Sequence, residues 1–136
     1  MDKVIKMPNG SFIRLNDIYL IKNIEDNKNS GTNFKVSTIQ GKSYTMRFSD
    51  DENTTQYREY IIDMFEDHNI LKSVDGEVTI VDKIISVIKL NDGFRVNFSD
   101  KLYTIFRGEG TDDIFYSVEY KLSNYYEILT MDIIDI

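Results

Sequence analysis

The 136-residue sequence lacks cysteine and tryptophan, and it contains one proline and one histidine. The absence of cysteine excludes disulfide bonds, thiolate metal sites and thiol nucleophiles, and it is typical of a reducing compartment. Because no apolar run approaches the length of a membrane-spanning helix, we expect neither such a helix nor an export leader. We therefore expect a cytoplasmic protein with no membrane contact.

Motifs of known enzymes are also missing. His68 has no G-x-S-x-G elbow to accompany it, cannot form a multi-histidine metal site, and is expected to be structural near a helix end. The stretch Gly108–Thr111 lacks the G-K-[ST] ending of a phosphate-binding loop. The acidic clusters at 50–52 and 109–113 lack calcium-loop spacing and lie where helix N-termini favour carboxylates. We expect no enzyme, no catalytic residues, no cofactor and no metal site.

One short segment occurs twice. Val4–Leu15 returns in the second half of the chain as Ile70–Val81, with Asn9-Gly10 aligned on Asp75-Gly76. Both dipeptides favour tight hairpin turns, and apolar residues flank both copies. The sequence therefore predicts a tandem duplication in an α+β, β-rich fold. Each unit, 1–69 and 70–136, has about five short antiparallel strands in a bent sheet or small partly open barrel, followed by a helix. We expect the two units to pack as one compact body.

The later strands repeat as well. After the hairpin we expect a third strand around residues 18–24, a polar loop at 25–32, and strands near 34–38 and 44–48, where apolar and polar residues alternate. The second unit repeats these strands. Ile84, Val87 and Leu90 align with Ile18, Ile21 and Ile24, and Phe94-Arg95-Val96 aligns with Phe34-Lys35-Val36. After a deletion of one residue, Tyr103-Thr104-Ile105 aligns with Tyr44-Thr45-Met46.

Each unit is predicted to end in a helix. Ser49 and Glu52 fit a capping box, and behind them one apolar helical face carries Tyr57, Tyr60, Ile61, Met64 and Phe65. When Val118 is aligned on Tyr57, the segment 111–130 repeats this helix with Thr111 as its N-cap. The same segment also alternates from Ile114 to Leu122, so a strand is the alternative.

Charge is unevenly placed along the chain, whose net charge is −7. The segments 50–68 and 108–136 each hold seven acidic residues against one basic residue, whereas the strand regions are basic and rich in aromatics. The simplest interpretation is that both acidic segments are solvated helix faces. The basic strands could bind single-stranded nucleic acid, but the acidic segments would repel phosphate unless they face away. We therefore expect direct nucleic-acid binding to be unlikely.

The acidic segments favour instead a non-enzymatic protein-binding module. We expect it to dock on a basic, nucleic-acid-handling host protein, as a phage or mobile-element inhibitor or adaptor that mimics DNA. If 111–130 is helical, two tyrosines also lie off its buried face and could anchor a partner. The expected partner-binding residues are Glu52, Glu59, Asp63, Glu66, Asp67, Glu109, Asp112, Asp113, Tyr116 and Tyr120. The alternative is a small-molecule or nucleotide site in a cleft between the repeats. The tail Met131–Ile136 could pair with a sheet edge or form a homodimer.

Overall fold

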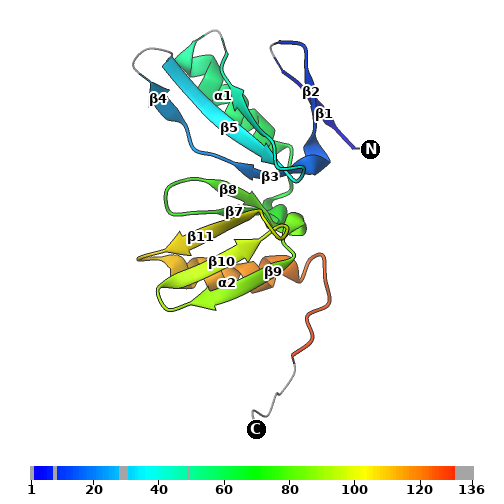
Figure 1. Ribbon diagram of the computed structural model, residues 1–136, viewed down its shortest axis with the longest axis vertical. Coiled ribbons are helices and arrows are strands. Elements are labelled where there is room, and N and C mark those ends of the chain that lie inside the picture. Colours follow the sequence, from blue (N-terminus) through cyan, green and yellow to red (C-terminus); the bar gives the residue numbers. More distant parts are fainter. Residues whose placement is uncertain (1, 8, 28–30, 49, 131–136) are drawn as a thin grey trace.

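The computed structural model describes residues 2–7, 9–27, 31–48 and 50–130. In these residues eleven strands form three open antiparallel sheets, and two α-helices complete an α+β, β-rich fold, as predicted (Figure 1). The strands are β1 (Val4–Lys6), β2 (Phe12–Arg14), β3 (Ile18–Ile21), β4 (Glu25–Asn27), β5 (Gly31–Thr38), β6 (Ser43–Met46), β7 (Ile70–Lys72), β8 (Val78–Ile80), β9 (Ser86–Leu90), β10 (Gly93–Asn97) and β11 (Tyr103–Arg107). The helices are α1 (Asp51–Asp63) and α2 (Thr111–Leu122), with short 3-10 turns at Leu15–Asp17, Asp67–Asn69 and Val81–Lys83.

The largest sheet joins the two halves of the chain. Its strand order is β4-β5-β3-β8-β7, with β6 also paired to β5. Leu20 lies opposite Thr79 and Ile21 opposite Val78 in the β3–β8 pair. The second hairpin, β7–β8, therefore completes the sheet of the first half. The first hairpin, β1–β2, forms a sheet of its own, and β9, β10 and β11 form the third.

Two hydrophobic cores follow from this arrangement. In the first, Ile70, Val78 and Ile80 from the second hairpin pack with residues of the first half, among them Ile21 and Phe34. The second core contains residues from both halves too, because Leu20 and Leu71 pack with Phe94, Phe106 and Val118. The β7–β8 hairpin thus contributes one face to each core.

The first helix begins as predicted but buries a different face. Asp50 is its N-cap and accepts a hydrogen bond from the Asn53 N–H at 2.7 Å, whereas Ser49 lies outside the described residues. Tyr57 and Tyr60 are exposed, so the predicted apolar stripe was wrong at these two positions. The buried positions of α1 include Arg58 and Ile62 instead.

The second segment is a helix, and the strand alternative is excluded. Gly110 (φ +82°) is the N-cap of α2, so Thr111, predicted as the cap, is the first helical residue. Its hydroxyl donates to the carbonyl of Gly108 at 2.8 Å. The side chain of Val118 is buried at the centre of the helix.

The strand registers agree with the predicted repeat at the hairpins and correct it later. Ile5 lies opposite Ile13, and Leu71 lies opposite Thr79, so both strands of the hairpin keep the predicted alignment. In the later strands Phe34 lies opposite Met46, and Phe94 lies opposite Phe106. If Phe94 is aligned with Phe34, Phe106 therefore aligns with Met46, and no deletion is needed. The match of Tyr103 with Tyr44 was therefore wrong by one position. The duplication itself stays a prediction.

The segment 25–32, predicted as a loop, contains β4 and the start of β5, which pair with each other. The first half therefore has six strands rather than five. The predictions for the tail, which concern residues 131–136, lie outside the described residues. No helix among the described residues is long and apolar enough to span a membrane.

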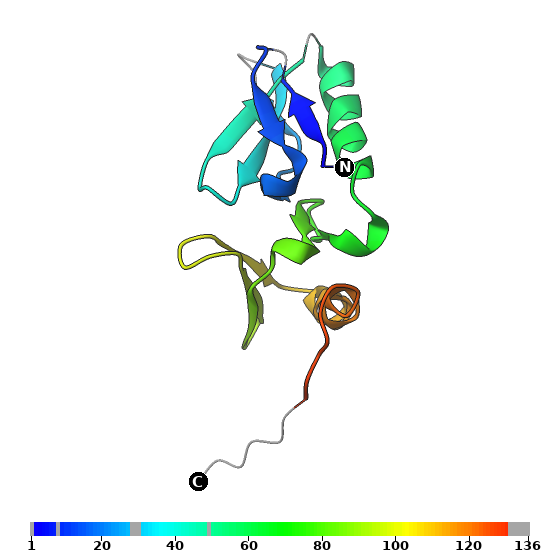
Figure 2. The same cartoon turned by 90° about the vertical axis from the view of Figure 1, so that its right-hand side faces the viewer.

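Both helices lie on the same side of the molecule. α1 packs against β5, and α2 packs against β10 and β7. Figure 2 shows the two helices on the right and the opposite faces of the sheets on the left. We call this opposite side, formed by β5, β6, β9, β10 and β11, the helix-free face.

Candidate nucleic-acid interface

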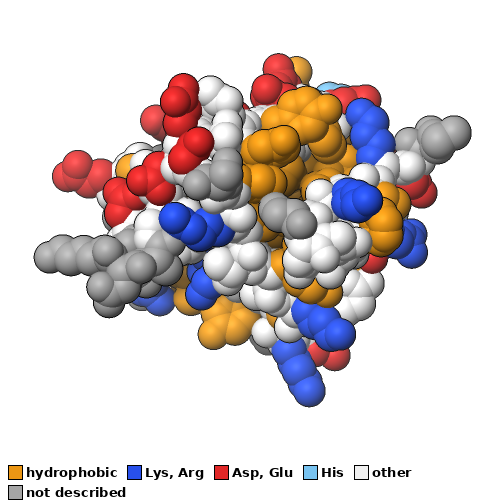
Figure 3. Space-filling model, turned by 90° about the horizontal axis from the view of Figure 1, so that it is seen from above, with side chains coloured by type: hydrophobic (Ala, Val, Ile, Leu, Met, Phe, Trp, Pro, Cys, Tyr) orange, Lys and Arg blue, Asp and Glu red, His pale blue; other side chains and the backbone are white. Residues whose placement is uncertain are grey.

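Strands and helices carry opposite charge. The eleven strands contain seven Lys or Arg and two acidic residues, whereas the two helices contain seven acidic residues and two basic ones. Figure 3 shows the separation on the top of the molecule, where acidic side chains gather at the upper left and most Lys and Arg side chains lie below or to the right. The acidic segments therefore do not surround the basic ones.

Strand alternation places two cations on the helix-free face at equivalent positions. Phe34 and Val36 are buried, and the exposed Lys35 between them points to the other side of β5. Phe94 and Val96 of β10 are buried in the same way. Arg95 between them therefore points away from the core that contains Val118 of α2, as Lys35 points away from the core that contains Ile61 of α1.

The three-stranded sheet presents an arginine beside an aromatic ring. The guanidinium carbon of Arg95 lies 5.4 Å from the ring centre of the exposed Tyr103. The exposed Ile88 and Ile105 flank Arg95 on the neighbouring strands, opposite it in register. The buried Nε of Arg95 makes no protein hydrogen bond. Arg can donate to phosphate, while the tyrosine ring can stack on a base or sugar.

The large sheet continues this surface with lysine and hydroxyl groups. Lys35 lies opposite Thr45, and the hydroxyls of Ser37 and Ser43 are 2.9 Å apart. Lys and hydroxyl side chains are common donors to DNA phosphates. Ser37 is buried, so the groups in this part of the face that a phosphate can reach are those of Lys35, Ser43 and Thr45.

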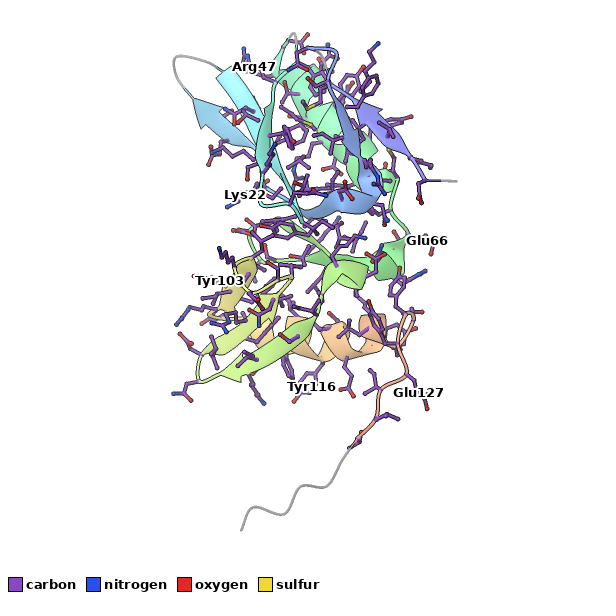
Figure 4. The ribbon with its side chains drawn as sticks, turned by 45° about the vertical axis from the view of Figure 1, so that its right-hand side comes forward. Lys22, Arg47, Glu66, Tyr103, Tyr116 and Glu127 are labelled. Atoms are coloured by element: carbon purple, nitrogen blue, oxygen red, sulfur yellow. The ribbon has the colours of Figure 1, made fainter. Side chains whose placement is uncertain are left out.

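Two further cations border the face. The ammonium of Lys22 is 4.0 Å from Glu77, and a guanidinium nitrogen of Arg47 is 3.9 Å from Asp51. Both pairs are long and the side chains of the two cations are about half exposed, so both cations remain accessible to a phosphate. In Figure 4, Arg47, Lys22 and Tyr103 lie on one side of the molecule, whereas Glu66 and Glu127 lie on the other.

One carboxylate lies beside these cations. Burial raises the pKa of Glu77, although the charge of the nearby Lys22 acts to lower it. The Thr104 hydroxyl lies 3.4 Å from the Oε1 atom of Glu77. Glu77, Asp75 and Arg107 line a cleft of about 250 Å³ next to β11. Because two carboxylates line this cleft, it does not favour a phosphate-bearing ligand.

A ligand cleft between the two halves is small. The cleft that residues such as Leu15, Phe65 and Lys83 line has a volume of about 180 Å³. Typical small-molecule sites have roughly 300–1,000 Å³. The geometry therefore gives no support to the predicted small-molecule or nucleotide site.

The predicted partner-binding residues lie mainly on and beside the helices. Glu52, Glu59 and Asp63 are on α1, and Asp112, Asp113, Tyr116 and Tyr120 are on α2, with Glu66, Asp67 and Glu109 just outside them. Tyr116 and Tyr120 are 71% and 74% exposed, as predicted for a helix. Both helices lie on the same side of the molecule, and no observation tests a role of these residues in binding a partner.

The side chains of Asp51 and His68 contact other residues of the fold. Hydrogen bonding from the Thr32 N–H, at 3.0 Å, lowers the pKa of Asp51. His68 Nε2 is 2.8 Å from a carboxylate oxygen of Glu66, and its ring packs near Tyr125. In the described part of the chain, no three His, Cys, Asp or Glu residues are placed to hold a metal ion.

Comparison with known proteins supports the fold. The chain is similar to the solved structure of a LytTr DNA-binding domain of a putative methyl-accepting/DNA response regulator from Bacillus cereus. The TM-score is 0.55 and the sequence identity 12%, and the match covers 87% of this chain and 95% of that one. No family model matches the chain, and no curated protein matches it in sequence.

This likeness contradicts our hypothesis of an acidic protein-binding module. The fold is shared with a DNA-binding domain, which conflicts with an inhibitor or adaptor that mimics DNA, with the expected basic protein partner, and with the expectation that nucleic-acid binding is unlikely. The sequence does not show whether the acidic segments face away from the basic strands, and we expected them to repel phosphate. The two helices carry seven acidic residues against two basic ones, whereas the strands carry seven Lys or Arg against two acidic residues.

From the sequence, the cations of this face were considered for binding single-stranded nucleic acid, and that function was judged unlikely. Arg95, Lys35 and Lys22 each precede or follow apolar strand residues. The period-2 alternation could have placed Lys35 and Arg95 on one face of their strands. It could not show that the helices cover the other face.

Proposed function

We propose that this chain binds DNA through its helix-free face, as a non-enzymatic and cytoplasmic domain. The observation that carries the proposal is the separation of charge on a fold shared with a LytTr DNA-binding domain. Phosphate contacts are assigned to Lys22, Lys35, Arg47 and Arg95, and Tyr103 is assigned to stacking or van der Waals contact with the nucleic acid.

The electrostatics of this arrangement favour one orientation on the nucleic acid. With the helices pointing away, the carboxylates of α1 and α2 lie on the helix side, except Asp51, which pairs with Arg47. Charges separated by more than about 10 Å are largely screened at 0.1 M salt. The more distant helix carboxylates therefore oppose phosphate binding weakly, whereas Glu77 beside Lys22 and Asp51 beside Arg47 lie within that distance.

Fluorescence anisotropy with a labelled DNA duplex tests the proposal. Each phosphate that is neutralised changes the slope of log K against log salt by about −0.9, so four contacts give a slope of about −3 to −4. Lys35→Ala and Arg95→Ala should each weaken binding and make the slope less steep by about one. Neither side chain is part of a core, so both variants should fold normally.

The matched control is Lys121→Ala, which removes one positive charge from α2 on the helix side. Its affinity and salt slope should equal those of the unmodified chain. Absence of duplex binding at low salt would overturn the proposal. So would equal losses in Lys35→Ala and Lys121→Ala, because the effect would then depend on net charge alone.

A further inference from the structure

The two hairpins of the chain hold equivalent positions but have different surroundings. Val78 of the second hairpin is 0% exposed, because β8 pairs with β3 and packs in the first core. Phe12, the equivalent residue of the first hairpin, is 67% exposed. Among the described strands β2 pairs with β1 and with no other. One edge of β2 thus lacks a pairing strand such as β3, which pairs with β8, and the side chain of Phe12 on β2 is left exposed.

The complementary edge is at the other end of the molecule. β3 pairs with β5 on one side and β8 on the other. Its equivalent β9 pairs with β10 alone among the described strands. Val87 lies opposite Val96 as Ile21 lies opposite Val36, so the two strands match position by position. In Figure 1 the β1–β2 hairpin lies near the upper end of the long axis and β9 near the lower end.

The free edge of β9 borders an apolar cleft. Its volume is about 420 Å³, and its lining includes Val87 of β9 and Leu122 of α2, with Ile85 just before β9 and Tyr126 just after α2. In the first half the residues aligned with Val87 and Leu122, which are Ile21 and Ile61, share a core with Val78. The cleft is therefore the position that a hairpin occupies in the first half. A phenylalanine at position 12, which is larger than the valine at 78, fits an open cleft of this size.

We propose that the β1–β2 hairpin of one copy adds to the free edge of β9 of a second copy, reproducing between chains the β8–β3 pairing within the chain. Within the chain, Val78 lies opposite Ile21 and Thr79 opposite Leu20. The same register between copies places Phe12 opposite Val87 and Ile13 opposite Ser86. This contact is heterologous, since each copy uses two different surfaces. Such a contact joins copies head to tail, in a ring where the rotation between copies closes and in an open row where it does not. The inference does not depend on DNA binding.

Cysteine cross-linking tests the register, because the chain has no cysteine of its own. Paired residues on adjacent strands lie within the Cα distance that a disulfide spans. When Phe12→Cys and Val87→Cys variants are mixed and mildly oxidised, a mixed disulfide should form. The control mixture of Phe12→Cys with Tyr116→Cys, whose cysteine lies on α2, should remain unlinked at the same concentration.

Sedimentation of the full chain over a range of concentrations measures the association itself. Phe12→Glu should raise the dissociation constant at least about tenfold, because it places a charge in the apolar cleft, and Tyr116→Glu should leave it unchanged. A monomer at all concentrations would overturn the proposal. It would also be overturned by a Val87→Cys homodimer that forms without Phe12→Cys, or by association that appears only when residues 131–136 are removed.

Discussion

A buried arginine connects the helix of the first half to the hairpin of the second half. Arg58 of α1 is 6% exposed. Its Nε donates to the carbonyl of Lys22 at 2.8 Å, and one terminal nitrogen donates to the carbonyl of Gly76 at 2.8 Å. The other terminal nitrogen lies 3.3 Å from the exposed Glu59. Burial lowers the pKa of Arg58, with Glu59 acting in the opposite direction.

Substitution of Arg58 by methionine should destabilise the fold substantially. Methionine keeps most of the apolar stem and removes the two hydrogen bonds that end at the carbonyls of Lys22 and Gly76. A hydrogen bond from a charged group contributes about 1.5–3 kcal/mol, so the loss of two should lower the free energy of unfolding by about 3–6 kcal/mol. For a chain of this length that is a fall in melting temperature of about 10 °C or more.

Urea unfolding followed by circular dichroism measures this loss. The matched control is Arg14→Met, because Arg14 is exposed and lies 3.9 Å from Asp17. An exposed pair of this kind contributes at most about 1 kcal/mol. If Arg58→Met and Arg14→Met had the same stability, the connection through Arg58 would contribute nothing and the reasoning would be refuted.

Three further substitutions test other parts of the fold. Gly93→Ala should destabilise by about 2 kcal/mol or more in urea unfolding, because the added Cβ would lie 1.8 Å from the carbonyl oxygen of Phe106. Asp50→Ala should cost about 1 kcal/mol in the same assay, because it removes the N-cap of α1. Glu77→Gln should stabilise the chain at neutral pH, because burial raises the pKa of Glu77 and so makes its charged form unfavourable in the native state.

The pH dependence of Glu77→Gln follows from the sign of that shift. The native state holds the Glu77 proton more tightly than the unfolded state, so its relative stability is greatest below the ordinary glutamate pKa. The contribution of the Glu77 proton to the stability of the native state is lost as the pH rises through the raised pKa. The gain of the variant should therefore disappear in acid. A gain that persists there would assign the effect to packing. Unchanged stability of Gly93→Ala or Asp50→Ala would contradict the contacts assigned to those residues.

Local turn chemistry and helical periodicity were readable from the sequence. Asn9-Gly10 and Asp75-Gly76 predicted two hairpins, and both glycines have φ near +90°. The first helix was predicted from its period. The second was predicted only through its likeness to the first, since local alternation favoured a strand equally. Sequence patterns of a few residues were therefore sufficient to predict hairpin turns and the first helix, which depend on local interactions.

Long-range relations could not be read in the same way. The pairing of β3 with β8 joins two very short strands, which contain too little pattern to specify a partner. The same limit explains the slip at Tyr103, because a shift by one position leaves the alternation intact but reverses the face. The site depended on this information, since only the fold shows that Arg95 and Tyr103 face away from the helices.

The shared sheet has a consequence for how the chain is synthesised. β3 acquires its second neighbour only after Ile80 has been made, although residues 1–69 are completed earlier. During that interval the first sheet has an unpaired edge, and its core lacks Ile70, Val78 and Ile80. A nascent chain in this state exposes apolar surface to its neighbours on the same messenger RNA. Folding of the first half is therefore coupled to translation of the second, and a gene split after codon 69 would encode a first fragment that cannot complete its own core.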